Sequence, residues 1–290
     1  MELLPLCLVM ISAISHAFWN LLAKKGLNKM AFIWLTSFSS LISVLPAFIL
    51  ILPRIFYPIN ATPFLLASGF IEALYFISLV KAYEAGDLSL VYPLARSSPL
   101  IVLILAVVFL KETISSWGII GLSLVILGVY VIHLRSFSFR DFIHPIVSLR
   151  SRASQWALMT AIWTSIYSLI DKMAVGIVDP ILYAFWLDIF IVIFLTPIVF
   201  KRLGLRRIVA EFKENRMNPI VSGFLMRAGY VLVLVALSLS QLSYIISIRQ
   251  LSIVLGSFLG ITLLHEPYGK SRLIGSILIF SGVFTLSVLG

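Results

Sequence analysis

Ten apolar segments, each of about 20 residues, make up most of this 290-residue chain. The hydrocarbon core of a bilayer is about 30 Å thick, so a helix needs roughly 20 apolar residues to cross it. Only residues 134–152 and 201–217 form longer connections, and both are basic. The sequence therefore predicts an all-α, polytopic membrane protein without a soluble domain. The predicted membrane helices are approximately 3–23, 31–52, 63–82, 88–110, 114–133, 153–173, 180–200, 218–239, 242–264 and 271–289.

The composition excludes a soluble globular protein. Apolar residues make up 61% of the chain and charged residues only 12%, which is about half the charged share of soluble domains. The net charge of +10 would suggest nucleic acid as the partner of a soluble protein. Here most lysines and arginines fall in short connections between apolar segments, where they are ordinary loop charge. We expect the lipid bilayer as a partner and no nucleic acid.

The sequence contains few signs of an enzyme or of a cofactor-binding protein. Cys7 is the only cysteine, which excludes a disulfide within the chain and a thiolate metal cluster. No HExxH, GxSxG or phosphate-binding glycine loop occurs. We therefore expect no cofactor, no metal and no catalytic residue. The N-terminus lacks the basic region of a signal peptide, so we expect it to remain as the first helix.

The second half of the chain repeats the first. A shift of 154 residues aligns the third to fifth segments with the eighth to tenth. It places Ser68-Gly69-Phe70 on Ser222-Gly223-Phe224, and Leu110-x-Glu112 on Leu264-x-Glu266. Because each half has five segments, the second half must enter the membrane in the opposite direction. We predict two inverted five-helix repeats, residues 1–133 and 153–290, joined by a basic linker at 134–152, around a central cavity near the midplane.

Several residues that the repeat aligns have structural explanations. Glu112 and Glu266 each precede a predicted helix, where the helix dipole favours an acid, so capping is preferred to substrate contact. Glycines at matched positions in both halves, and a Gly256-x-x-x-Gly260 motif, are typical of close helix packing. The matched glycines are Gly121, Gly128, Gly275 and Gly282.

Specific motifs carry a family resemblance. HAFWNLLAKK in the first helix, YPLARSSP in the fourth, and LxE followed by GxxxxxxG in both halves resemble the EamA branch of the drug/metabolite transporter superfamily. The resemblance implies a ten-helix basket in the cell membrane, with a central cavity lined by helices 1, 3, 4, 6, 8 and 9. Some relatives that carry sugar phosphates use basic residues on the fourth and ninth helices.

Arg96 and Arg249 place permanent positive charge inside the membrane. Arg96 lies eight residues into the fourth segment, about 12 Å deep, and Arg249 lies seven residues into the ninth, which runs the other way. A lipid-facing arginine costs at least a few kcal/mol. We expect both to face a wet cavity, where the forked guanidinium suits carboxylate or phosphate. The alternative is pairing with internal acids or carbonyls. Pro93 and Pro99 flank Arg96 and can break the fourth helix.

Three further charged residues lie deep in the predicted helices. Glu72 and Arg227 align to neighbouring positions in the repeat, which favours an ion pair between the halves; alternatively, both contact substrate, or Glu72 carries a proton. Asp188 lies on the seventh helix, which the resemblance places at the periphery, and is expected to pair with a neighbouring helix. Three arginines against these two acids leave a deep charge of +1, which disfavours cationic substrates.

A mixed polar and aromatic wall is predicted for the pocket. His16, Trp19 and Asn20 share one face of the first helix, and Trp163 and Tyr167 occupy similar positions on the sixth. Such a wall suits a small polar metabolite, although packing and an interfacial aromatic belt are the alternative. Tyr75 and Tyr92 are weaker candidates for the same pocket.

The sequence thus predicts a secondary transporter that moves a small anionic or zwitterionic metabolite, of amino acid or organic acid type, by alternating access. A proton or an ion is a candidate coupling partner. A membrane scaffold or lipid-handling protein remains an alternative, and an intramembrane enzyme is the least favoured because no catalytic spacing is recognised. Connections on one side hold 16 lysines and arginines against 3 on the side of the termini. This places the termini outside, whereas the resemblance favours a cytoplasmic location.

Overall fold

The computed structural model describes residues 2–24, 26–51, 57–86, 91, 94–132, 134, 137–264 and 269–289. Within these ranges all regular structure is helical. Tyr92, Pro93 and Glu266 lie outside the described residues, so the roles expected for them stay predictions.

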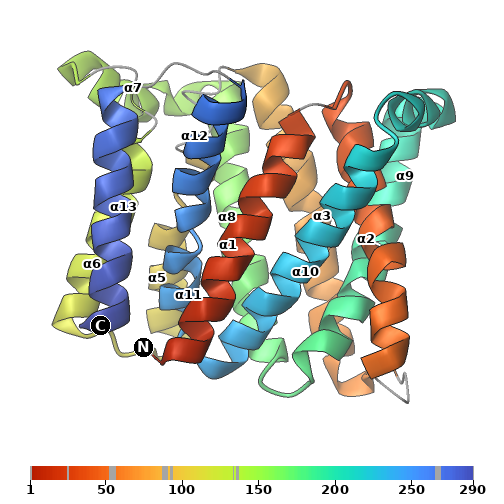
Figure 1. Cartoon of the computed structure of the whole chain (residues 1–290), viewed down its shortest axis with the longest axis horizontal. Helices are drawn as coiled ribbons and strands as arrows, with labels where there is room; N and C mark the ends of the chain where they lie inside the picture. Colours follow the sequence, from red (N-terminus) through yellow and green to blue (C-terminus); the bar gives the residue numbers. More distant parts are fainter. Residues whose placement is uncertain are drawn as a thin grey trace.

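In the first half of the chain, α1, α2 and α3 run from one edge of the molecule to the other, whereas the shorter α5 lies in the half near the termini (Figure 1). α5 begins only at Ser98, later than the predicted fourth segment, and Pro99 lies in its first turn, where the missing amide costs no helical hydrogen bond. The break expected in this segment is therefore observed just after Arg96. The elements are α1 (Leu3–Lys24), α2 (Lys29–Ile51), η1 (Ile59–Ala61), α3 (Thr62–Ala85), α5 (Ser98–Phe109) and α6 (Ser116–Val131).

The second half begins at the opposite edge. Both termini lie at one edge of the molecule, where α1 starts, whereas α8 starts at the other edge, so these two helices run in opposite directions (Figure 1). The elements are α7 (Phe139–Val147), η2 (Ser148–Arg150), α8 (Arg152–Ala174), α9 (Pro180–Glu214), α10 (Met217–Leu239), α11 (Leu242–Ile248), α12 (Leu251–Leu264) and α13 (Lys270–Val288).

Two connections and one segment differ from the prediction. The linker contains α7 and η2, and the chain after residue 200 continues as helix beyond a kink at Gly204, whose φ of 71° suits glycine. The ninth segment, expected as one helix, is split into α11 and α12 at Arg249 and Gln250. Both deep arginines predicted from the repeat thus lie at helix breaks.

The two halves interlock through helices that the repeat relates. α1 packs against α10 as α8 packs against α3, and α2 packs against α10 as α9 packs against α3. Gly69 and Gly223, which the repeat aligns, allow these contacts. A Cβ on Gly69 would lie 2.7 Å from Cβ of Phe190, and one on Gly223 would lie 2.7 Å from the carbonyl oxygen of Thr36. Glycine is therefore needed where the halves meet most closely.

The matched glycines of the last helices also pack as predicted. α6 lies along α13, and a Cβ on Gly275 would lie 2.5 Å from the amide nitrogen of Ile132. A Cβ on Gly128 would lie 2.7 Å from the amide nitrogen of Ile279. The contact expected at Gly256 is wrong, because a Cβ there would have nothing within 4 Å in the described part of the chain.

The outer surface of the molecule is apolar. Within the described ranges, six helical stretches are long and apolar enough to cross a membrane, and α5 and α6 are shorter apolar helices. Large side chains such as Ile104, Phe109 and Phe280 are more than half exposed. Exposure on this scale would cause aggregation in water and suits contact with lipid. The six stretches are Leu3–Ala23, Ile59–Ala85, Pro180–Glu214, Met217–Leu239, Leu242–Leu259 and Lys270–Val288.

Candidate functional site

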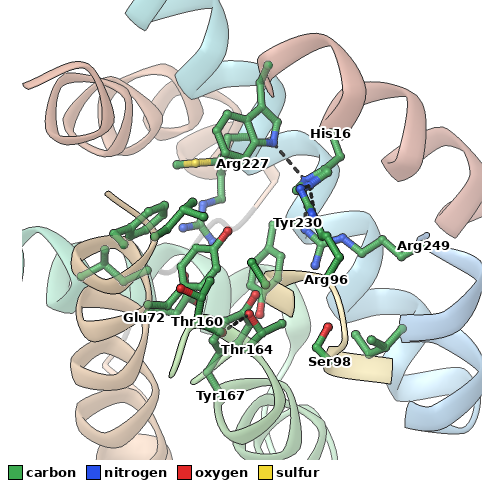
Figure 2. A pocket seen from close by; sticks show the side chains of 18 of the residues that line it. His16, Glu72, Arg96, Ser98, Thr160, Thr164, Tyr167, Arg227, Tyr230 and Arg249 are labelled. Carbon is green, nitrogen blue, oxygen red and sulfur yellow. Dashed lines mark hydrogen bonds between the residues drawn. The ribbon is translucent and has the colours of Figure 1, made fainter. Parts of the chain in front are cut away.

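A pocket lies between the two halves, lined by helices from both (Figure 2). It brings together most of the residues predicted from the sequence to line a substrate cavity. These are His16, Trp19, Glu72, Tyr75, Arg96, Tyr167, Arg227 and Arg249.

Arg96 and Arg249 enter the pocket from interrupted helices. Arg96 occupies the turn before α5, and Arg249 is the C-cap residue of α11, one residue beyond its end. A break in a membrane helix is tolerated where the backbone lines a cavity rather than facing lipid. The repeat aligns the two breaks, so the inverted halves bring their arginines to a common site. Both residues line the pocket between the halves.

His16 on α1 connects the two arginines. Both terminal nitrogens of Arg96 lie 3.2 Å from Nε2 of His16, and Nη2 of Arg249 lies 3.4 Å from its Nδ1. Nε1 of Trp19 also donates to Nδ1, at 3.1 Å. Figure 2 shows His16, Arg96 and Arg249 gathered at one side of the pocket. We call these three residues the basic cluster.

The basic cluster contains more hydrogen-bond donors than acceptors. Guanidinium and indole nitrogens only donate, whereas a neutral imidazole has one donor and one acceptor nitrogen. If Nδ1 accepts from Trp19, Nε2 carries the proton and faces the donors of Arg96. If Nε2 accepts from Arg96, the proton on Nδ1 faces Trp19 and Arg249. No tautomer of His16 satisfies all three donors, so the cluster is suited to a group that only accepts, such as a carboxylate or a phosphate.

Arg227 forms an ion pair, but with a different acid from the one predicted. Its Nη2 donates to Oδ1 of Asp188 on α9, and both side chains are only 3% exposed. The predicted pair between Arg227 and Glu72 is therefore wrong in this structure. Asp188 does pair with a neighbouring helix, as expected, but it lines the pocket and does not lie at the periphery. A buried guanidinium needs such a partner to offset its desolvation.

Asp171 is a buried acid that the sequence analysis missed. It is 0% exposed and accepts hydrogen bonds from Ser68 at 2.6 Å, from Tyr183 at 2.7 Å and from Tyr230. Three hydroxyl donors from α3, α9 and α10 satisfy a carboxylate that has no basic partner among the described residues. The predicted charge of +1 is wrong for this reason, since three acids now balance three arginines.

Tyr230 links this network to the pocket. Its hydroxyl bonds Asp171, while its ring lies 5.5 Å from the guanidinium carbons of both Arg227 and Arg249. A cation over a tyrosine ring at this distance is attracted by the ring quadrupole. Tyr230 follows Arg227 by three residues, which is the spacing of one helix face. That spacing could have identified it from the sequence.

Glu72 on α3 reaches the pocket away from the basic cluster (Figure 2). The residue is 8% exposed, and its Oε1 has no hydrogen-bond partner among the described residues. Buried carboxylate oxygens are normally satisfied. The position of Glu72 gives the pocket two ends, with positive groups at one and an unsatisfied carboxylate at the other.

The sixth predicted helix contributes hydroxyl groups instead of its tryptophan. Thr160, Thr164 and Tyr167 on α8 line the pocket at the spacing of one helix face. Trp163 is not among the lining residues. The amide of Asn20 donates to the carbonyl of His16 at 2.7 Å on its own helix, and Asn20 is likewise outside the lining. Tyr75 lines the pocket, with its ring 5.8 Å from that of Tyr167.

Hydrogen bonds from both halves surround the connection from α10 to α11, on the edge that holds the termini. Glu112 accepts from the amide of Leu242 at 2.6 Å and from the amide and hydroxyl of Ser243 at 3.2 and 2.6 Å. Lys172 donates to the carbonyls of Leu237 and Ser240 at 2.5 and 2.8 Å. Glu112 therefore caps a helix, as predicted, but the helix belongs to the other repeat.

The described residues contain no group of three or more His, Cys, Asp or Glu side chains that could hold a metal ion. The lining of the pocket itself offers hydrogen-bond donors and acceptors, fixed charge and aromatic surface.

The profile of the EamA-like transporter family matches residues 3–134 and again residues 151–288. The chain belongs to the EamA-like transporter family. It is an integral, multi-pass membrane transporter of the drug/metabolite transporter superfamily, with two EamA units in one chain. The resemblance seen in the sequence motifs is therefore confirmed.

A comparison with solved structures supports the same fold. One structure, titled only as the crystal structure of a protein, superposes with a TM-score of 0.74 over 98% of this chain and 99% of its own. The two sequences are 13% identical, so this likeness describes the fold alone. The search among curated proteins found no match.

Proposed function

We propose that this transporter moves a small metabolite that carries a carboxylate, either an organic acid or a zwitterion of amino acid type. The observation that carries the proposal is the convergence of N–H donors from both repeats on one imidazole, that of His16 in the basic cluster. Trp19, Arg96 and Arg249 all direct N–H groups at one imidazole. A bound carboxylate would offer two oxygens, each with free lone pairs, and would resolve this conflict.

The rest of the pocket supports a small and polar substrate. Hydroxyl groups of Thr160, Thr164 and Tyr167 and the ring of Tyr230 line it together with a few apolar side chains. Pockets for small metabolites combine apolar walls with a few placed polar groups in this way. A permanently cationic substrate without an acceptor group could meet only Glu72 and would offer nothing to the donors of the basic cluster, so we do not expect it to be carried.

We further propose ten membrane-crossing segments in two inverted repeats, residues 1–133 and 153–290, with 134–152 as the linker. Transport would follow from rocking of one repeat against the other around the midplane pocket. Arg96 and Arg249, one from each repeat, would then hold the substrate while access alternates.

The alternatives fit the structure less well. A scaffold or lipid-handling function does not explain why two arginines and a histidine line an internal pocket, where buried charge is costly. An enzyme would require a nucleophile beside a base. Asp188 in the pocket bonds Arg227, Asp171 behind it bonds three hydroxyls, and the Oε1 atom of Glu72 has no hydrogen-bonded nucleophile among the described residues. Binding and translocation remain the better explanation.

Uptake by purified protein in proteoliposomes tests the proposal. The screen compares monocarboxylates, amino acids, sugar phosphates and quaternary ammonium compounds in vesicles with and without the protein. We expect saturable uptake of at least one carboxylate series, with loss of uptake in Arg96→Gln. Uptake confined to the quaternary ammonium compounds, or uptake that Arg96→Gln leaves unchanged, would overturn the proposed function.

A further inference from the structure

Glu72 stands apart from the other buried acids of the site. Asp188 bonds Arg227, and Asp171 bonds Ser68, Tyr183 and Tyr230. Glu72 also lines the pocket, yet its Oε1 makes no hydrogen bond within the described part of the chain. A buried carboxylate oxygen without a hydrogen bond is stabilised by a proton or a cationic group that reaches it. The pocket therefore contains a group suited to a cation, separate from the basic cluster.

The charges around the pocket determine when Glu72 takes up a positive charge, because a bound substrate carboxylate changes their balance. Among the described residues, Arg96, Arg227 and Arg249 line the pocket with Glu72 and Asp188, and Asp171 lies directly behind it, bonded to the lining residue Tyr230. These three arginines balance these three carboxylates when all of them are ionised and His16 is neutral. A bound substrate carboxylate adds one negative charge to a site of low dielectric, where uncompensated charge is costly. One additional positive charge restores the balance, and Glu72 is the acid with room to accept it.

We infer that Glu72 is a cation subsite that takes one positive charge for each substrate carboxylate held by the basic cluster. That charge is a proton when the substrate is a monoanion, or the ammonium group of the substrate when it is a zwitterion. The inference rests on the proposed function and deepens it, because it names how the charge of the substrate is neutralised during transport.

The titratable and charged groups that surround Glu72 must be considered before a pH dependence of binding is assigned to it. On α8 they are Asp171 and Tyr167, on α9 Asp188 and Tyr183, and on α10 Arg227 and Tyr230, with Arg249 beyond them. Tyr75 lies on the same helix as Glu72. Asp171 and Asp188 are held by hydrogen bonds and an ion pair, so Glu72 is the carboxylate that changes its charge state. His16, in the basic cluster, is the other side chain of the pocket that can gain a proton, so the Glu72→Gln variant is needed to separate the two.

Matched ligand pairs distinguish a proton from a substrate ammonium group. The probes are propanoate with L-alanine, 4-methylpentanoate with L-leucine, and 3-phenylpropanoate with L-phenylalanine, titrated into the purified full-length protein by calorimetry between pH 5 and pH 8. The variants are Glu72→Gln, Arg96→Gln and the control Glu84→Gln. Glu84 lies on the same helix, half exposed and bonded to Arg202 at 2.7 Å, so its variant should behave as wild type.

The two sources of positive charge give opposite results. If the proton is used, the monoanion binds wild type more tightly as pH falls, by up to tenfold per pH unit, which is the linkage expected for one proton. Glu72→Gln, which mimics the protonated acid, then binds the monoanion tightly at every pH. If the substrate ammonium is used, the amino acid binds wild type independently of pH, and Glu72→Gln weakens it at least tenfold.

Other outcomes overturn the inference. Equal binding of both series by wild type and Glu72→Gln at every pH, with Arg96→Gln still weakened, would refute the cation subsite while leaving the proposed function standing. A pH dependence that survives in Glu72→Gln would assign the titration to His16 and refute it too. If neither ligand of any matched pair binds, or if the Arg96→Gln variant binds them with the same affinity as wild type, the proposed function is refuted and the inference with it.

Discussion

Both terminal nitrogens of the Arg96 guanidinium lie 3.2 Å from Nε2 of His16. The two residues come from the turn before α5 and from α1, and Arg249 reaches the other imidazole nitrogen from the second repeat. One histidine thus connects the matched arginines of two inverted halves. This contact explains how two permanent positive charges are held close together. One imidazole cannot accept from all of the converging N–H groups, and a substrate carboxylate would supply further acceptor atoms.

The pair of Arg227 with Asp188 should behave as a buried ion pair. Removal of one partner, in Asp188→Asn or Arg227→Gln, leaves the other charge buried, and we expect a loss of about 3–5 kcal/mol in the free energy of unfolding. The double variant Asp188→Asn/Arg227→Gln should recover much of that loss. Thermal melts in detergent measure all three. The exposed pair Glu84–Arg202 is the control, where loss of either partner should cost at most about 1 kcal/mol.

Strict additivity of the Asp188 and Arg227 changes would contradict this pairing. A restored double variant would also show that the ion pair serves to satisfy its own members rather than to stabilise the fold. The sequence could not have selected this pair. Glu72 and Asp188 are both mid-helix acids, and the choice between them depends on helix rotation, which spacing along the chain does not determine.

Two glycines test the predicted contact between the repeats. Gly275→Ala places a Cβ 2.5 Å from the backbone of Ile132, whereas Gly256→Ala places one that has no described atom within 4 Å. We expect Gly275→Ala to lower the melting temperature because α13 must move away from α6. Gly256→Ala should be neutral or stabilising by up to about 1 kcal/mol, from helix propensity alone. Equal melting temperatures for the two variants would show that α6 and α13 do not pack as closely as described.

Glu112 should help to close the pocket on the side of the termini. Glu112→Gln loses the charge that holds the α11 amides, a contribution of about 1.5–3 kcal/mol for a hydrogen bond to a charged group. In a Cys7→Ser background, Ser247→Cys on buried α11 reports access to an impermeant maleimide. We expect faster labelling from the side of the termini in Glu112→Gln, and no change in Glu84→Gln. Unchanged labelling would mean that Glu112 only caps the helix.

The distribution of basic residues predicts the orientation. The side opposite the termini holds 16 lysines and arginines against 3, so that side should be cytoplasmic. In a bacterial host, alkaline phosphatase fused to the C-terminus should be active, and green fluorescent protein at the same position should be dark. A bright fluorescent fusion with an inactive phosphatase fusion would place the termini in the cytoplasm, against the charge distribution.

The sequence was most informative where a pattern repeats. Apolar segments predicted the helices, and the shift of 154 residues predicted that Gly69 and Gly223 would lie in equivalent environments. It failed where a single residue acts outside any pattern. Nothing in the apolar run 242–264 indicates a break at Arg249, because neither proline nor glycine lies beside it. Asp171 was missed since its three hydroxyl partners come from three other helices, and only the packed structure brings these together.

Substrate binding by Arg96 variants tests the central claim most directly. Calorimetry with the best carboxylate from the uptake screen compares wild type, Arg96→Lys and Arg96→Gln. Lysine keeps the charge but loses the planar fork, so we expect weaker binding. Glutamine should cost about 1.5–3 kcal/mol, which is roughly 10- to 150-fold in Kd. Unaltered affinity in Arg96→Gln, in a variant that melts as wild type, would show that Arg96 is structural and that the basic cluster does not bind the substrate.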